Sequence, residues 1–384
     1  MTEFYQDREQ TKAKHEILRR YLESFAHKVV RTYGSIDFVD AFCGPWEERD
    51  VTGLTDTSIG IALEKLNKVA ETLEKVDKPK IRCIFNEKDS NAFRKLAEFV
   101  DQNRQRFPLL EIHMLHGEFE QNAFEIERLS QNKFMLLFVD PTGWSGFSPE
   151  ALKTLIGQRE SEVIINFMRS FVERFLCPPG PDQEIRLAEV LGAKRAQALS
   201  GQYVGIEKLE NELVAVLKND FGFRFAASSP IHNPDKDQIQ FKLFYATHHP
   251  AGMEVMRDSE FKALSEHDQE RFRKTQDSRQ QSLFGEEPQV LGPYLRKRKE
   301  HLHNLSSHIR KRLSGSSHAL KFMNLRAELQ QTHYLREAEI KDCIVTLANE
   351  GAIEPTWEKR NGRRPGSEDH IFLTDEGKLD ARSD

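Results

Sequence analysis

Hydrophobic residues in the first half of the chain gather in short runs, and acidic or turn-forming residues stand at or near the ends of most of them. Such runs lie at residues 36–42, 81–87, 111–117, 134–140 and 162–168. The run at 134–140 begins with six apolar residues without a break, and a run that short without alternation is typical of a strand buried on both faces. Between the runs, apolar residues recur at helical spacing. The alternation of strand and helix predicts a doubly wound, mostly parallel α/β sheet.

Two further runs predict a β-hairpin. They lie at residues 221–227 and 239–249, and the segment between them is rich in turn-forming residues. Residues 181–220, which precede the hairpin, have the pattern of a polar helical insertion. Five parallel strands closed by a hairpin make a seven-stranded, Rossmann-like sheet, which is the layout of S-adenosylmethionine (SAM)-dependent methyltransferases. This similarity concerns the fold and carries limited functional weight.

Acidic residues stand where the predicted strands end. Asp40 lies near the end of the first run, Glu87 and Asp140 close two others, and Glu118 follows a fourth. Because the carboxyl ends of parallel strands share one rim, where ligands bind, we expect these side chains to converge on one site. Each position alone is also explained by strand termination, since Asp, Pro and Gly are common there without any chemistry.

The first two strands carry a weak nucleotide-binding pattern. A glycine after Asp40 lets the backbone approach a ligand, and an acid that ends the second strand commonly hydrogen-bonds ribose hydroxyls. The pattern is weak because there is one glycine instead of a Gly-x-Gly pair, and Trp46 stands where a small residue is expected. The candidate SAM-binding residues are Asp40, Phe42, Gly44, Glu87, Lys88 and Glu118.

The fourth strand leads into the catalytic candidates Asp140, Pro141 and Trp144. Their pattern resembles the Asp-Pro-Pro-aromatic motif of amino-methyltransferases. There, the acid and a proline carbonyl accept hydrogen bonds from an exocyclic amine, and an aromatic ring stacks on the base. In this chain the aromatic residue comes one place late and the second proline is missing.

The chain changes in character after residue 257. Charged residues dominate 257–287, and Gln, Ser, Gly and Pro are frequent up to residue 293, which predicts a linker that is mobile in part. Basic clusters at 296–299 and 310–312 indicate a basic helix, which is either a solvated face or a phosphate contact. We therefore expect a methyltransferase-like domain, a charged linker with a basic helix, and a third domain, over residues 1–257, 258–315 and 316–384.

The last domain has the pattern of a winged helix. Helices are predicted over 319–330 and 337–350, and short strands over 352–357 and 370–374. In a winged helix bound to a duplex, one helix enters the major groove and a basic loop between strands grips phosphates. Nucleic acid, DNA rather than RNA, is the favoured partner, and dimerisation or protein docking is the alternative. The candidate nucleic-acid-binding residues are Lys341, Lys359, Arg360, Arg363 and Arg364.

Composition argues against several other classes of protein, such as polycations, disulfide-linked proteins, metal-binding proteins and membrane proteins. A net charge of -5 over 384 residues excludes a polycation, so any nucleic-acid surface must be local. The cysteines are far apart, which fits a reducing compartment better than a disulfide framework: they are Cys43, Cys83, Cys177 and Cys343. No metal site is expected, since His248 and His249 have no further ligand at suitable spacing. No run reaches membrane-spanning length and no signal peptide is seen, so we expect a cytoplasmic protein.

Six stretches together resemble the three-Cys-motif partner proteins (TcmP). These are bacterial and archaeal proteins encoded beside a radical-SAM-like protein with three cysteines. The stretches follow one another over nearly all of the first 257 residues, at 14–18, 38–45, 85–89, 138–147, 165–168 and 249–256. The resemblance implies a methyltransferase fold and a radical-SAM-like partner.

The chain departs from the TcmP pattern at two positions. The family tends to have a glycine in place of Trp46, which affects cofactor access, and an aliphatic residue in place of Asn86, which we expect to matter little. Lys14 and His15, in the first stretch, could face a ligand, but we interpret them as solvated helix surface.

Three functions remain open. The chain is a SAM-dependent methyltransferase acting on nucleic acid, or a non-catalytic nucleic-acid-binding or partner-binding subunit. In a third, weaker interpretation, the partner supplies the chemistry and this chain positions its substrate.

Overall fold

The computed structural model describes residues 5, 8–44, 50, 54–141, 149–156, 160–169, 173, 178–236, 238–278, 291–360 and 362–380. The chain divides into two compact units, Met1–His248 and His249–Asp384. Each unit is described by itself.

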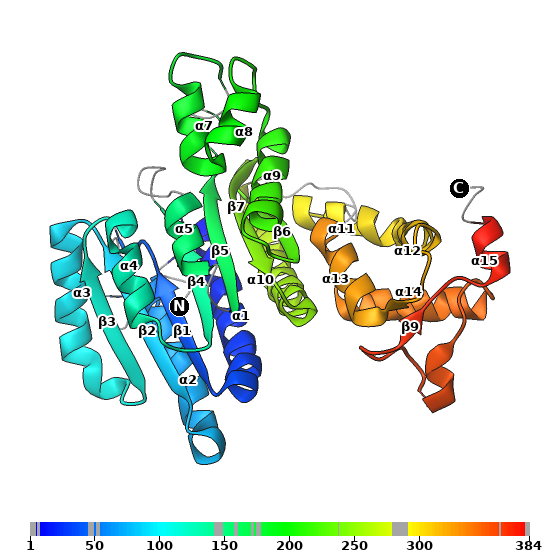
Figure 1. The fold of residues 1–384 in the computed structure, drawn as a ribbon, viewed down its shortest axis with the longest axis horizontal. Helices are drawn as coiled ribbons and strands as arrows, with labels where there is room; N and C mark the ends of the chain where they lie inside the picture. Colours follow the sequence, from blue (N-terminus) through cyan, green and yellow to red (C-terminus); the bar gives the residue numbers. More distant parts are fainter. Residues whose placement is uncertain are drawn as a thin grey trace. The chain divides into compact units, whose positions relative to one another are not determined.

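A seven-stranded sheet in the order β3-β2-β1-β4-β5-β7-β6 forms the first unit (Figure 1). The first five strands are parallel and β7 is antiparallel to both of its neighbours. Their bounds are β1 Ser35–Asp40, β2 Lys80–Glu87, β3 Leu110–His116, β4 Phe134–Val139, β5 Glu160–Met168, β6 Phe225–His232 and β7 Ile239–Thr247. The predicted mostly parallel, methyltransferase-like sheet with a closing hairpin is confirmed.

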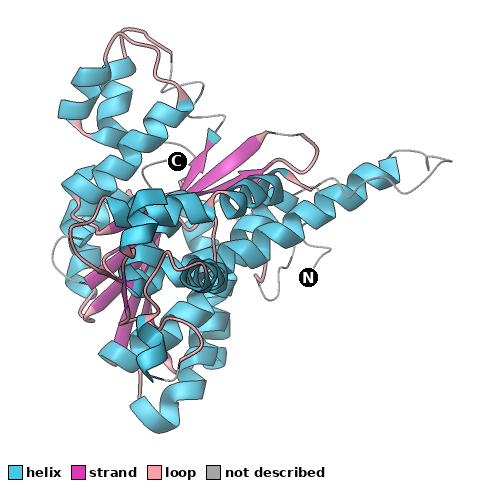
Figure 2. Ribbon diagram, turned by 90° about the vertical axis from the view of Figure 1, so that its right-hand side faces the viewer, coloured by secondary structure: helices cyan, strands magenta, loops and turns pink. Residues whose placement is uncertain are grey.

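Helices cover both faces of this sheet (Figure 2). Helix α1 packs against α2, and its Phe25 ring lies 5.5 Å from that of Phe134 in β4. On the opposite face of the sheet, strand residues such as Leu137 pack in one apolar cluster with the helices that lie between β3 and β6 in the sequence. The helices of this unit are α1 Glu9–Tyr33, α2 Ser58–Asp77, α3 Ser90–Asn103, α4 Phe119–Leu129, α5 Pro149–Ile156, α7 Gln183–Leu191, α8 Ala193–Leu199 and α9 Ile206–Ala215, with a π-helical turn, η4, at Val216–Asp220 and a 3-10 turn, η2, at Arg104–Arg106.

Local sequence signals fix the ends of the helices that lead to the rim. Helix α1 ends at Gly34, whose φ of 73° suits glycine and whose N–H bonds the Val30 carbonyl at 2.7 Å. The Thr57 hydroxyl caps α2 by accepting from the Gly60 N–H at 3.1 Å. The Asp89 carboxylate caps α3 in the same way. These caps set where α1 ends and where α2 and α3 begin.

The second unit is mostly helical around one apolar core, in which Trp357 is 2% exposed. Its helices are α10 Pro250–Ser278, α11 Pro293–His303, α12 Leu305–Ser314, α13 Phe322–Thr332, α14 Glu337–Asn349 and α15 Asp375–Asp380. Strands β8 (Leu320–Lys321) and β9 (His370–Ile371) form a short antiparallel pair. The two helices predicted at 319–330 and 337–350 are present with small shifts.

Two sequence predictions for this unit are wrong. The predicted strand at 352–357 is a single bridge from Ile353 to Leu373 followed by the 3-10 helix η5, Thr356–Arg360. Pro355 has no N–H to continue the pairing, and the buried Trp357 anchors the turn into the core. Residues 258–278, predicted as part of a linker, continue α10. Their charges hid buried positions such as Leu264. No described helix is long and apolar enough to cross a membrane.

Candidate functional site

Asp40 ends β1 and is fully buried. Its Oδ2 accepts from the Ser58 hydroxyl at 2.6 Å and its Oδ1 from the Phe42 N–H at 3.2 Å. Burial raises the pKa of this carboxyl to about 7, although those two bonds oppose the shift. The nearby Asp140 charge raises the pKa further and the Lys14 charge lowers it. Asp40 therefore changes charge near neutral pH.

Gly44 and Glu87 lie together beside Asp40. A Cβ placed on Gly44 would lie 2.4 Å from Glu87 Oε2, so a side chain there would displace the carboxylate. Glu87 is 6% exposed, and its Oε1 accepts from the Asp89 N–H at 2.7 Å. Its Oε2 has no hydrogen-bond donor among the described residues. The structure thus brings three of the predicted cofactor-binding residues together and leaves an acceptor there.

Asn86, near the end of β2, connects the loops that follow β1 and β3. Its Nδ2 donates to the carbonyl oxygens of Ala41 and Gly117, each at 3.2 Å, and its Oδ1 accepts from Asn122 Nδ2 at 2.7 Å. Its backbone carbonyl accepts from the Cys43 N–H at 3.0 Å. Only an amide side chain can both donate and accept in this way. The expectation that Asn86 matters little is wrong.

Lys14 is buried at the same rim, against the prediction of a solvated position. It is 8% exposed, and its Nζ lies 2.5 Å from Asp140 Oδ2. Asn166 Nδ2, from β5, donates to Asp140 Oδ1 at 2.6 Å. Lys14 also lies over the Phe241 ring, 5.5 Å from its centroid. A sequence signal existed, since Lys14 shares the apolar helix face with Leu18 and Tyr21.

His15 is the second member of that pair to be buried, at 6% exposure. Its Nδ1 lies 3.0 Å from the Tyr5 hydroxyl. Burial, together with the nearby Lys14 and Arg19 charges, holds the His15 pKa well below its usual value. His15 is therefore neutral at physiological pH.

The other predicted rim residues differ in their surroundings. Phe42 is half-buried, with its ring 5.5 Å from that of Phe119. Lys88 and Glu118 are exposed and form an ion pair at 3.8 Å. Pro141 is buried beside Asp140. Trp144 and Trp46 lie outside the described residues.

The basic residues predicted in the second unit are partly neutralised. Lys341 pairs with Glu337 and Arg364 with Asp342, each at 2.5 Å, and both acids lie on α14. Arg363 is exposed and has no acidic partner among the described residues. The side chains of Lys359 and Arg360 lie outside the described part of the structure. Helix α14, the expected groove-reading helix, is thus more acidic than basic.

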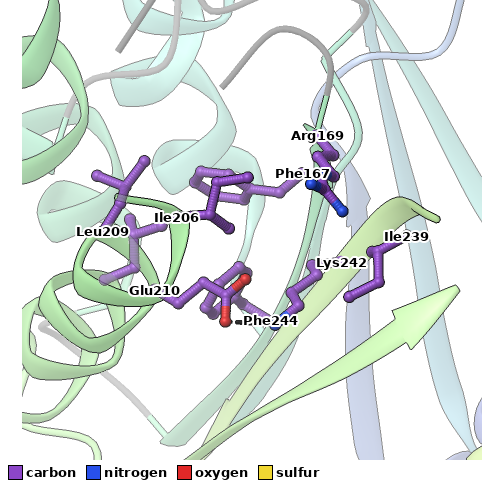
Figure 3. Close-up of a pocket in the computed structure, with 9 residues that line it drawn as sticks. Phe167, Arg169, Ile206, Leu209, Glu210, Ile239, Lys242 and Phe244 are labelled. Carbon is purple, nitrogen blue, oxygen red and sulfur yellow. Dashed lines mark hydrogen bonds and ion pairs between the residues drawn. The ribbon is translucent and has the colours of Figure 1, made fainter. Parts of the chain in front are cut away.

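A small pocket lies between α9 and strands β5 and β7 (Figure 3). Its walls are mostly apolar, with Phe167 and Phe244 side by side, and Lys242 at its rim forms an ion pair with Glu210. Phe167 faces away from its neighbour Asn166 across the sheet, because alternate strand residues point to opposite faces. None of the predicted site residues lines this pocket.

No family model matches the chain, and no curated protein does. Several solved structures resemble it, and two of them illustrate the extent of the similarity. A Legionella pneumophila protein of family DUF519 shares 11% identity over 66% of this chain and 91% of its own, with a TM-score of 0.40. M. jannaschii TYW2 in complex with AdoMet shares 12% identity over 59% of this chain and 74% of its own, with a TM-score of 0.24. Scores this low add nothing to the strand order, on which the methyltransferase-like fold rests.

Proposed function

We propose that the chain is a SAM-dependent methyltransferase-like protein that acts on or with nucleic acid, alongside a radical-SAM-like three-Cys protein. The cofactor part rests on one observation, the grouping of Asp40, Gly44 and Glu87 at neighbouring strand ends. In open α/β sheets a nucleotide lies outside these strand ends, with its ribose on the acid of the second strand. The open Oε2 of Glu87 suits a ribose hydroxyl, so the residues present fit the cofactor.

Calorimetry with SAM tests the cofactor part. We expect the wild type to bind SAM in the micromolar range, which corresponds to about 8 kcal/mol. Glu87→Ala should abolish measurable binding, and Glu98→Ala, which removes an exposed carboxylate from α3, should not. Absence of SAM binding to the wild type, or unchanged binding by Glu87→Ala, would overturn the cofactor proposal.

The nucleic-acid part is supported by three exposed cations of the second unit, Lys299, Lys311 and Arg363, which have no acidic partner among the described residues. The acids on α14 disfavour base reading by that helix, so we expect phosphate contacts. Replacing the three cations by alanine should weaken duplex binding and flatten its salt dependence by about one unit of slope per lost contact. An unchanged salt slope, measured by fluorescence anisotropy on duplex DNA and on RNA, would contradict this part.

A non-catalytic subunit is the second candidate, and one observation favours it. Both carboxylate oxygens of Asp140 already accept one hydrogen bond each, from Lys14 and from Asn166, so a target amine would have to share an acid that the chain itself holds in place. Transfer of labelled methyl groups to DNA or RNA, measured with and without the neighbouring gene's product, separates the candidates. SAM binding without transfer in either condition would leave the binding subunit. Co-purification with that product tests the partner.

A further inference from the structure

Lys14, Asp140 and Asn166 form a polar cluster beside the cofactor residues, and the proposed function gives it no clear task. Asp140 follows β4, Asn166 lies in β5, and the pairing of Val139 with Ile165 makes these two residues neighbours. Lys14 reaches Asp140 Oδ2 from α1, while Asn166 Nδ2 bonds Oδ1. The carboxylate is therefore held at both oxygens by groups from two different elements.

The side-chain oxygen of Asn166 accepts no hydrogen bond from the described residues. The residue is 3% exposed, and its buried Oδ1 makes no hydrogen bond. The orientation of the amide is fixed, because exchanging its oxygen and nitrogen would place Oδ1 against the Asp140 carboxylate. Buried polar atoms are nearly always hydrogen-bonded in native proteins, so this oxygen is a site where a donor from a bound ligand or water can be accepted.

Lys14 supplies hydrogen-bond donors in the same cluster, in contrast to the acceptor of Asn166. An ammonium group has three donors, and Asp140 takes one of them. The cluster thus offers a cationic donor beside uncharged and anionic acceptors. The complement of this arrangement is a small group with a carboxylate and an ammonium close together, which is an α-amino acid in its zwitterionic form.

The position of the cluster agrees with that ligand. Strand β1 stands between β2 and β4, so the direction of winding reverses beside it. Ligands in open α/β sheets bind at this switch point. Glu87 lies on the β2 side of it, and Asp140 and Asn166 lie on the β4 and β5 side. A ligand that crosses β1 would contact both groups of residues.

We propose that Lys14, Asp140 and Asn166 bind the α-amino acid end of the cofactor whose nucleoside end lies at Asp40, Gly44 and Glu87. Lys14 Nζ donates to the carboxylate, and the ammonium donates to Asn166 Oδ1 and to Asp140. The inference rests on the proposed cofactor function and deepens it. It assigns Asp140 to cofactor binding instead of to the orientation of a target amine.

Two ligands distinguish binding of the amino acid end of the cofactor from binding of its nucleoside end. S-adenosylhomocysteine carries both the nucleoside and the amino acid, whereas methylthioadenosine lacks the amino acid. By calorimetry, Asn166→Leu and Lys14→Met should each weaken binding of S-adenosylhomocysteine by about tenfold or more, and leave methylthioadenosine within about twofold. Lys65→Met is the matched control. Lys65 lies on α2, is shielded from solvent, and pairs with Glu23 of α1 at 2.9 Å.

Lys14→Met leaves Asp140 without its cation, and this variant can fail to fold. The double variant Lys14→Met/Asp140→Leu removes both charges and carries the same expectation. Wild type that binds neither ligand would overturn the cofactor function itself. Wild type that binds both ligands equally well, or variants that keep their affinity for S-adenosylhomocysteine or lose both ligands alike, would overturn this assignment and leave the cofactor function in place.

Discussion

Two buried carboxyl clusters lie under the same helix, on the same face of the same sheet, and they differ in how completely they are hydrogen-bonded. The rim cluster joins Lys14 of α1 to Asn166 of β5 through Asp140. The inner cluster joins Tyr21 of α1 to Glu162 of β5. Its members stand seven residues further along the helix and four residues back along the strand, so both clusters face α1.

The inner cluster is closed. Glu162 Oε1 accepts from the Thr247 hydroxyl at 2.6 Å, and its Oε2 accepts from the Tyr21 hydroxyl. The Tyr21 and Tyr245 hydroxyls are 3.0 Å apart. Both oxygens of Glu162 are satisfied by the chain itself, whereas Asn166 Oδ1 at the rim is not. A complete network holds a helix on a sheet, and an incomplete one indicates a ligand site.

The largest effect that would distinguish the clusters is expected from Asp140→Ala. This change leaves Lys14 shielded without a counter-charge, and removal of one partner of a buried pair costs about 3 kcal/mol of unfolding free energy. Affinity for S-adenosylhomocysteine should fall with it. If Asp140 oriented only a target amine, urea denaturation would still show the loss of stability, but calorimetry would show unchanged affinity.

The next effect is a pH dependence that belongs to the inner cluster. Burial raises the pKa of Glu162 to about 7, above its unfolded value, so the folded chain holds this proton more tightly. The stabilisation is complete at acidic pH and is lost as the pH rises through about 7, by up to about 1.4 kcal/mol per pH unit. Asp40 adds a similar contribution.

Glu162→Gln should remove the Glu162 part of this slope and leave cofactor affinity unchanged. Urea titrations between pH 5 and 8, compared with Asp40→Asn, measure the two contributions separately. A Glu162→Gln variant whose stability varies with pH as the wild type does would contradict the buried, proton-binding state of Glu162.

A smaller effect is expected from Asn86→Leu at the rim. The substitution removes the amide and leaves the carbonyls of Ala41 and Gly117 and the amide of Asn122 with one partner fewer. Lost bonds of this kind reduce the unfolding free energy by about 1–3 kcal/mol. Binding of methylthioadenosine should weaken as the loops beside Gly44 loosen. Asn91→Leu, at an exposed position on α3, is the control.

The smallest expected effect is a pH-dependent difference between SAM and S-adenosylhomocysteine. The sulfonium of SAM is a cation, and the thioether of S-adenosylhomocysteine is neutral. Ionisation of Asp40 near pH 7 should tighten SAM binding relative to the neutral ligand by a fewfold as the pH rises. Asp40→Asn should abolish the difference, and calorimetry in paired buffers would detect the proton released.

The sequence predicted the sheet and part of the rim because those features are local. Short apolar runs mark strands, and Asp40, Glu87 and Asp140 stand at or near the ends of these runs wherever the sheet lies. Lys14 and Asn166 were missed because their meaning depends on contacts with residues far along the chain. A charge on a helix is usually solvated, and only its position on the apolar face marked Lys14. In the second unit, charges on α10 concealed a buried face in the same way.

The bonds made by Asn86 have a consequence for motion. The Asn86 side chain donates to a carbonyl in the loop after β1 and to one in the loop after β3, so a movement of this side chain releases both loops at once. The amide protons of Cys43 and Gly117, which bond the backbone at Asn86 and Glu87, should then exchange with solvent at a common rate. Entry to the rim would be timed by one cooperative fluctuation of the backbone, set by an amide that never touches the ligand.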